Sequence, residues 1–211
     1  EHKPVQEHPH QVGGQPMVSV CVMTYNHVNY IKHCLDGILM QETDFPFEIL
    51  IGEDDSKDGT REICVEYACR YPNKIRLFLH HRENNIAVNG TPTGWFNSMY
   101  CLYNSVGKYI ALCEGDDYWV DHQKLQKQVD FMEQNVDCSL SFHPARVTYE
   151  DNSYPDKIFK PSDLEVGQKF TLLDFISSDD GLGITTASVL FRINLFKQIP
   201  DWLLQAPYGD A

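Results

Sequence analysis

The chain has 211 residues, and its 42% of hydrophobic residues suffice for one domain with a sizeable core. Lys and Arg number 17 against 30 Asp and Glu. The resulting net charge of −13 disfavours nucleic acid or an anionic membrane surface as the main partner. An anionic nucleotide remains compatible with this charge, because a bound metal ion reverses the local field.

Cysteine content and targeting signals indicate where the chain acts. The seven cysteines include no Cys-x-x-Cys pair, which favours small buried thiols in a reducing compartment over disulfides or a zinc site. The sequence has neither a signal peptide nor the run of about 20 apolar residues that spans a membrane. We therefore expect a cytoplasmic protein without a transmembrane segment, which peripheral association through a partner could hold at the inner membrane face.

Secondary-structure signals appear in a regular order along the first two thirds of the chain. Residues 1–16 hold His, Pro, Gln and Gly without periodicity, so we expect a disordered tail or an expression remnant there. Strands are then predicted at Val18–Thr24, Phe47–Gly52, Ile75–His80 and Tyr109–Cys113, and helices at His27–Gln41, Thr60–Tyr71, Gly94–Tyr103 and Gln123–Gln134. This alternation predicts an α/β fold with a doubly wound, mixed but mostly parallel sheet and helices on both faces.

The pattern changes in the last third, where short strands follow one another without long helices between them. They are predicted at Cys138–His143, Ala145–Tyr149 and Ala187–Arg192, with a short helix at Leu172–Ser177. We expect this part to continue the sheet and to add a variable covering region over residues 151–183. Residues 17–211 would then form a single domain.

Polar side chains follow the first three predicted strands. Thr24, Tyr25 and Asn26 offer a hydroxyl, an aromatic face and an amide that suit a nucleobase or a ribose, although Asn26 could equally cap a helix. After the second strand, Asp54 could accept hydrogen bonds from an imide N–H or a ribose hydroxyl, whereas residues 58–60 are typical of a turn and a helix start. Arg82 follows the third strand and could contact a phosphate or be a solvated loop cation.

Three carboxylates in four residues follow the fourth strand, in the sequence Glu114-Gly115-Asp116-Asp117. Carboxylates at the end of a buried strand repel one another, and a hard divalent cation between them removes that repulsion. In an open α/β sheet, ligands bind at this end of the strands. Asp116 or Asp117 could therefore hold Mg²⁺ or Mn²⁺ on a diphosphate. The alternative is a solvated acidic turn that caps the next helix.

The order of these clusters resembles that of family 2 glycosyltransferases, which have the GT-A fold. Val18–Asn26 looks like the opening strand of that family, and Glu114–Asp117 resembles its metal-site motif. Residues 53–60 resemble its Asp-Asp-Gly-Ser-x-Asp-Gly-Thr turn, with Glu53 in place of the first Asp and Asp55 in place of the Gly. The resemblance covers residues 17–143 well and the remainder loosely. The family's Ala-Arg-Asn segment is altered here to a stretch around Gly94 that contains no Arg.

The resemblance implies an inverting transfer from a nucleoside-diphosphate sugar, usually a UDP-sugar, to a hydroxyl of a carbohydrate or glycolipid acceptor. Such reactions serve polysaccharide or glycoconjugate synthesis. It implies a donor-binding half at residues 17–143 and an acceptor-side half at residues 144–211. The implied donor-binding residues are Thr24, Tyr25, Asn26, Asp54, Arg82 and Asp116, with Asp54 reading the base and Tyr25 stacking on it.

The resemblance also assigns the reacting groups. Asp117 falls on the position of the ligand for Mn²⁺ or Mg²⁺, and Asp116 on its neighbour that contacts the sugar or the ribose. Asp210 suits the general base, so the implied catalytic residues are Asp116 and Asp210. The family's helix after that base has no counterpart, because the sequence ends at Ala211. We therefore expect a domain truncated at its C-terminus.

Two other classes of function stay open on the sequence. A nucleotidyltransferase on a similar sheet would carry a Gly-rich loop with an Arg after the first strand, where this chain has Thr24-Tyr25-Asn26-His27. A non-catalytic nucleotide- or glycan-binding domain is the other class. The first strand is not followed by Gly-x-Gly-x-x-Gly, and the chain has no Gly-x-x-x-x-Gly-Lys-Ser/Thr. Both absences count against a Rossmann dehydrogenase and a P-loop enzyme.

Overall fold

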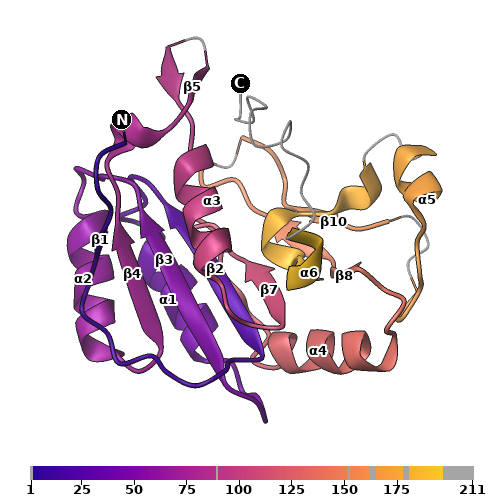
Figure 1. The fold of residues 1–211 in the computed structure, drawn as a ribbon. Coiled ribbons are helices and arrows are strands. Elements are labelled where there is room, and N and C mark those ends of the chain that lie inside the picture. Colours follow the sequence, from indigo (N-terminus) through magenta and orange to yellow (C-terminus); the bar gives the residue numbers. More distant parts are fainter. Residues whose placement is uncertain (1, 89, 152, 162–164, 178–180, 197–211) are drawn as a thin grey trace.

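A mostly parallel sheet of seven strands, in the order β1-β4-β3-β2-β7-β11-β8, runs through the molecule (Figure 1). The computed structural model describes residues 2–88, 90–151, 153–161, 165–177 and 181–196. Four strands form the parallel centre: β2 (Val18–Thr24), β3 (Phe47–Glu53), β4 (Ile75–Leu79) and β7 (Tyr109–Leu112). β1 (Gln6–Glu7) is antiparallel to β4, while β11 (Leu190–Arg192) is antiparallel to both β7 and β8 (Leu140–Ser141). The predicted α/β fold is confirmed.

Helices cover both faces of this sheet because its central strands are apolar on both sides. Val18, Val20 and Val22 of β2 belong to a core that includes buried residues of α1 (Ile31–Leu39), α2 (Thr60–Arg70) and α4 (Lys124–Gln134). Cys21, which points the other way, packs in a second core with Cys101 of α3 (Trp95–Asn104). Each buried Val or Leu side chain contributes about 1.5–3 kcal/mol. The sheet is therefore held between two apolar layers.

The N-terminal segment differs from the expected disordered tail. Gln6 and Glu7 pair with β4, and the backbone N–H of His8 donates to Leu77 O at 2.8 Å. Arg76 of β4 also donates from Nε to Glu7 at 3.1 Å. Without this segment β4 would be an open edge strand with unpaired backbone groups. The pairing depends on backbone atoms over two residues, so no periodic side-chain pattern indicated it.

The last third forms short elements beside the sheet, and its three predicted strands are all shorter than expected, with the third reduced to β11. The predicted strand at residues 138–143 is reduced to β8 within the main sheet. β9 (Ala145–Val147) leaves that sheet and pairs with a strand that was not predicted, β10 (Lys157–Phe159). The last third also contains the helices α5 (Leu172–Ser177) and α6 (Ile193–Phe196) and 3-10 turns at Gly181–Gly183 and Thr186–Ser188. Between β4 and α3, the chain forms a 3-10 turn at Arg82–Asn84 and a hairpin of β5 (Ala87–Val88) and β6 (Thr91–Pro92). In the part of the chain that the structure describes, every helix is too short or too polar to cross a membrane.

Candidate functional site

The polar clusters lie at one edge of the sheet because they follow three adjacent parallel strands. β2 pairs with β3 on one side and with β7 on the other, so the strand order reverses at β2. Thr24 ends β2, Asp54 follows β3, and Glu114 lies two residues beyond the end of β7. A reversal of this kind leaves a crevice at the carboxyl ends of the strands, which is where open α/β sheets bind ligands.

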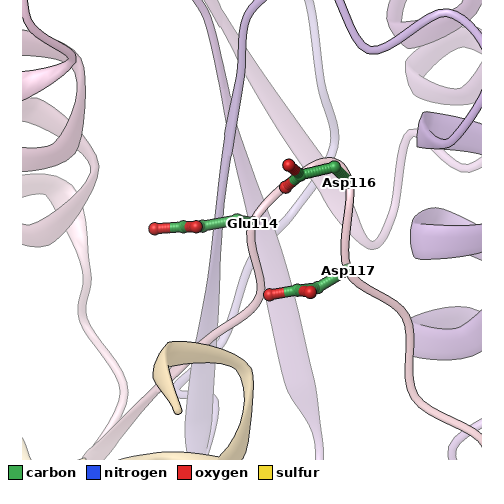
Figure 2. A group of neighbouring side chains, drawn as sticks. All are labelled: Glu114, Asp116 and Asp117. Carbon is green, nitrogen blue, oxygen red and sulfur yellow. The ribbon is translucent and has the colours of Figure 1, made fainter. Parts of the chain in front are cut away.

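The acidic loop after β7 gathers three carboxylates. Oxygen atoms of Glu114, Asp116 and Asp117 lie within 4.8 Å of one another, and the three side chains extend in the same direction in Figure 2. The loop is fixed by a hydrogen bond from Gly115 N to Met23 O at 2.9 Å and by a turn from Asp117 N to Glu114 O at 3.0 Å. Burial raises the pKa of Asp117 above its usual value, and the neighbouring charge of Asp116 raises it further.

His27 connects the end of β2 to the acidic loop. Its Nδ1 lies 3.3 Å from Thr24 Oγ1, and its Nε2 lies 3.8 Å from Asp116 Oδ2. Gly115 permits this approach, since a Cβ there would lie 2.5 Å from Thr24 Oγ1 and 2.7 Å from His27 Nδ1. His27 was not among the predicted site residues, although its position directly after Asn26 was a usable signal.

A second cluster surrounds Asp54, which is buried. Both of its carboxylate oxygens accept hydrogen bonds from Asn85 Nδ2 at 2.9 Å, and Arg82 Nη1 donates to Oδ2. Asn85 is itself oriented, because its Oδ1 accepts a hydrogen bond from Phe96 N at 3.0 Å. Burial raises the pKa of Asp54, while Asn85 and Arg82 act against this rise. Asn85 was not predicted, since a loop asparagine has no distinguishing pattern.

Tyr25 forms the remaining wall of this cluster. The Arg82 guanidinium lies over the Tyr25 ring, with Cζ 3.5 Å from the ring centroid, and Arg82 Nη2 donates to Pro92 O at 2.9 Å. The structure thus brings together three of the predicted donor-binding residues, namely Tyr25, Asp54 and Arg82. What they form is a flat aromatic surface beside a buried carboxylate.

Asn26 does not take the position of a helix cap, which was the predicted alternative to a role in binding a nucleobase or ribose. Its backbone is left-handed, with φ of 55°, and its N–H donates to Ser56 Oγ at 2.9 Å. Its Oδ1 accepts a hydrogen bond from Lys57 N at 3.1 Å. Asn26 therefore ties the turn after β2 to the turn after β3. Because the chain turns here, α1 begins at Ile31 rather than at His27.

Glu53, which stands where the resembling motif has Asp, organises the turn after β3. It is fully buried, accepts a hydrogen bond from Ser56 N at 2.7 Å, and pairs with Arg61. Arg61 also donates to His80 O at 2.9 Å. The glutamate thus fixes the loop that carries Asp54. The remaining predicted site residue, Asp210, lies outside the described residues.

The acidic loop carries the kind of oxygen ligands that a hard divalent cation prefers. Mn²⁺ and Mg²⁺ are bound in proteins mainly by carboxylate oxygens and water. Three carboxylates this close would repel one another when ionised, and a cation between them would convert that repulsion into attraction. Asp116 and Asp117 therefore fit such an ion, with Glu114 beside them.

Comparison with known proteins gives a consistent result. The family model described as glycosyl transferase family 2 matches residues 19–199. An uncharacterised protein of Mycobacterium tuberculosis is 42% identical over 144 residues, which are 68% of this chain and 39% of that protein. TuaG of Bacillus subtilis, provisionally named a teichuronic acid biosynthesis glycosyltransferase, is 30% identical over 143 residues, 68% of this chain and 52% of TuaG. The chain thus spans about two fifths to one half of these relatives.

Solved structures agree on the architecture. Staphylococcus aureus TarS 1–349 in complex with UDP-GlcNAc superimposes with a TM-score of 0.60 and 21% identity over 85% of this chain and 46% of TarS. The same protein in complex with UDP gives a TM-score of 0.60 and 20% identity over 90% of this chain and 52% of TarS. At this identity the likeness concerns the fold.

Proposed function

This chain belongs to glycosyl transferase family 2 and has the GT-A fold, and from that premise we propose that it binds the donor in a glycosyl transfer reaction. The donor is a nucleoside-diphosphate sugar, and a hydroxyl group accepts the sugar. The observation that carries this proposal is the placement of two clusters on adjacent strand ends. Tyr25 and Asp54 suit a base, Asp116 and Asp117 suit a cation on a diphosphate, and His27 lies against Asp116.

Tyr25 and Asp54 form the part of the site that we call the base cluster, and this cluster favours a base that carries a ring N–H. Asp54 offers an acceptor to such a group, and the Tyr25 ring offers a stacking surface. Uracil presents an imide N–H and fits this arrangement. The complexes of TarS with UDP and UDP-GlcNAc support a UDP-sugar as the donor. Thr24 and Asn26 fix the strand ends beside the base.

The acidic loop completes the donor site. We infer that Asp117 binds Mn²⁺ or Mg²⁺, and that Asp116 faces the sugar or the ribose. When bound, such an ion neutralises the charge that develops on a departing diphosphate. The chain's own contribution is positional, since His27 and the Gly115 backbone hold the loop against β2. The absence of a side chain at Gly115 lets Thr24 and His27 pack directly against the loop.

The reaction that fits this family is an inverting displacement. The acceptor hydroxyl attacks the anomeric carbon from the face opposite the diphosphate, and a carboxylate removes its proton. Asp210 remains the proposed general base. A carbohydrate or glycolipid acceptor in polysaccharide or glycoconjugate synthesis agrees with the name of TuaG. All seven cysteines are free, which supports a cytoplasmic location, at the inner membrane face if a partner holds it there.

Calorimetric titration with UDP and GDP, each with and without Mn²⁺, tests this proposal on the wild type and Asp117→Asn. We expect UDP to bind more tightly than GDP, to require the metal, and to lose most of its affinity in the variant. Asp121→Asn is the matched control, because Asp121 is half-buried and pairs with Lys127 on the following segment. Equal binding with and without Mn²⁺ would contradict the metal site. Release of UDP from a UDP-sugar separates the transferase from both alternatives, since a nucleotidyltransferase releases pyrophosphate and a binding domain turns nothing over.

A further inference from the structure

The Arg82 side chain occupies the place that the proposed function gives to the nucleobase. Its flat guanidinium covers the Tyr25 ring at 3.5 Å, which is a stacking distance, and its Nη1 donates to Asp54 Oδ2. A base in this site would need the same ring surface and the same carboxylate. The third contact, from Nη2 to Pro92 O at 2.9 Å, anchors the guanidinium from the β6 side.

We propose that the Arg82 side chain acts as an internal stand-in for the base in the unliganded chain. Arg82 fills the slot between Tyr25 and Asp54, and it must leave this slot when a nucleotide binds. This inference rests on the proposed function, because it takes the slot to be the base-binding part of a donor site. It adds an intramolecular competition that every nucleotide has to overcome. The apparent affinity is then the intrinsic affinity multiplied by the fraction of chains in which the slot is open.

The contacts around Asp54 explain how the exchange can occur without rebuilding the site. Asn85 holds both oxygens of Asp54 and is itself held by Phe96 N, so the carboxylate keeps its position when Arg82 leaves. The departing guanidinium removes one N–H donor from Oδ2, and a ring N–H of the base replaces it. The Tyr25 surface likewise exchanges a cation for a neutral ring, and both kinds of group stack on aromatic faces.

The partners of Arg82 also explain why the closed state is favoured without ligand. Asp54 is 1% exposed, and burial opposes its ionised form. The guanidinium compensates that charge, and its planar fork suits both the carboxylate and the ring. A chain without this cation keeps an uncompensated carboxylate facing an open slot, which favours any ligand that brings an N–H donor.

Arg82→Ala gives the central test, with Lys57→Ala as the matched control. Lys57 is a cation of the neighbouring turn that pairs with Asp55. Like Arg82→Ala, Lys57→Ala removes one positive charge from this region. Calorimetry at constant Mn²⁺ measures UDP and pyrophosphate on each protein. We expect UDP to bind about 5- to 10-fold more tightly to Arg82→Ala, as for a slot open in about one chain in ten of the wild type. Pyrophosphate, which has no base, should bind equally to both. Lys57→Ala should bind UDP no more tightly than the wild type.

Methylguanidinium sharpens the test, since it restores the missing group in free form. In Arg82→Ala it should compete with UDP, at an ionic strength matched with sodium chloride, because both need the same slot. Weaker UDP binding in Arg82→Ala that methylguanidinium restores would overturn the inference and make Arg82 an ordinary donor contact. Unchanged UDP affinity in Arg82→Ala would overturn it as well.

A second variant covers poor folding of Arg82→Ala. Arg82→Lys keeps a charge for Asp54 but cannot lie flat on Tyr25, so its UDP affinity should exceed that of the wild type by a smaller factor. An affinity below that of the wild type would contradict the stand-in role. Metal-dependent binding of UDP by the wild type preserves the proposed function whatever these variants do. Failure of the wild type to bind UDP would remove the donor site and this inference together.

Discussion

His27 Nε2 lies 3.8 Å from Asp116 Oδ2, and the same ring contacts Thr24 Oγ1 through Nδ1 at 3.3 Å. The histidine therefore fixes the acidic loop relative to the end of β2. On the other side of β2, Asn26 is bonded to the turn that precedes α2. Because both turns are attached to the same strand end, the base cluster and the acidic loop are held in a fixed position relative to each other.

Gly115→Ala should disrupt the fixed position of the acidic loop relative to the end of β2. The new Cβ would lie 2.5 Å from Thr24 Oγ1 and 2.7 Å from His27 Nδ1, so the acidic loop has to move away from β2. We expect metal-dependent UDP affinity to fall by at least about 10-fold, and the free energy of unfolding to fall by about 1–3 kcal/mol, as for an overpacked site. Calorimetry and urea unfolding measure the two effects.

The matched control for this substitution is Gly94→Ala. Among the described residues, a Cβ at Gly94 meets no atom within 4 Å, and Gly94 has φ of −88°. We expect that variant to keep wild-type UDP affinity and stability within about 0.5 kcal/mol. Wild-type affinity in Gly115→Ala would mean that the acidic loop does not need its contact with Thr24 and His27.

Tyr25→Leu should weaken UDP binding by about 10-fold or more. Stacking of a base on an aromatic ring contributes about 1–3 kcal/mol, and a leucine side chain offers no such face. Tyr25→Phe keeps the ring and should retain the affinity of the wild type. Pyrophosphate with Mn²⁺ should bind all three proteins alike, because it reaches only the acidic loop. An equal loss for pyrophosphate and UDP in Tyr25→Leu would place the effect outside the base slot.

Side-chain periodicity predicted the central strands and the helices because burial imposes it. Val18, Val20 and Val22 alternate toward one core, and residues of α1 recur at helical spacing toward the same core. The short strands β1 and β10 escaped prediction, since two or three residues carry no period. The start of α1 was placed too early because the left-handed backbone at Asn26 is set by a bond to Ser56, thirty residues away in sequence.

The candidate site was only partly readable for a related reason. Acidic and aromatic residues at strand ends marked Tyr25, Asp54 and Asp117, since strand ends converge whatever the loops do. Asn85 contacts Asp54 across 31 residues of sequence, and loop conformation alone decides that contact. The stacking of Arg82 on Tyr25 likewise depends on the loop after β4. Contacts between loops therefore required the structure.

His80 should make the protein less stable at acid pH. Its ring is buried edge-on against Phe96 and Tyr100, and neither ring nitrogen has a hydrogen-bond partner among the residues that the structure describes. Burial lowers its pKa from 6.5 to about 4, and Arg61 and His81 contribute to this shift. Between pH 6.5 and 4 the unfolded chain binds a proton that the folded chain does not, so stability falls as the pH falls through this window.

His80→Phe removes that proton and keeps the aromatic packing. We expect the loss of unfolding free energy between pH 7 and pH 4.5 to shrink by about 1–3 kcal/mol, as measured by urea unfolding at both pH values. His122→Ala, which replaces an exposed histidine, should retain the pH dependence of the wild type. A pH dependence in His80→Phe equal to that of the wild type would show that His80 is accessible to protons in the folded chain.

Lys124→Met should stabilise the protein near neutral pH. Lys124 is 4% exposed, its Nζ lies 3.7 Å from the Trp119 ring centroid, and the ammonium has no hydrogen-bond partner in the described part of the chain. Burial lowers its pKa from 10.5 to about 7. Between pH 7 and 10.5 the unfolded chain therefore holds a proton that the folded chain has released, and stability rises with pH across this window.

Methionine keeps the length of the side chain over Trp119 and places sulfur against the ring. We expect the free energy of unfolding at pH 7 to rise by about 1–3 kcal/mol, because no amine has to be desolvated. The rise in stability from pH 7 to pH 10 should become shallower. Lys127→Met is the control, since Lys127 is exposed and its removal should leave that slope unchanged. A loss of stability at pH 7 in Lys124→Met, with the wild-type slope retained, would mean that the contact between the ammonium and Trp119 outweighs the cost of burial.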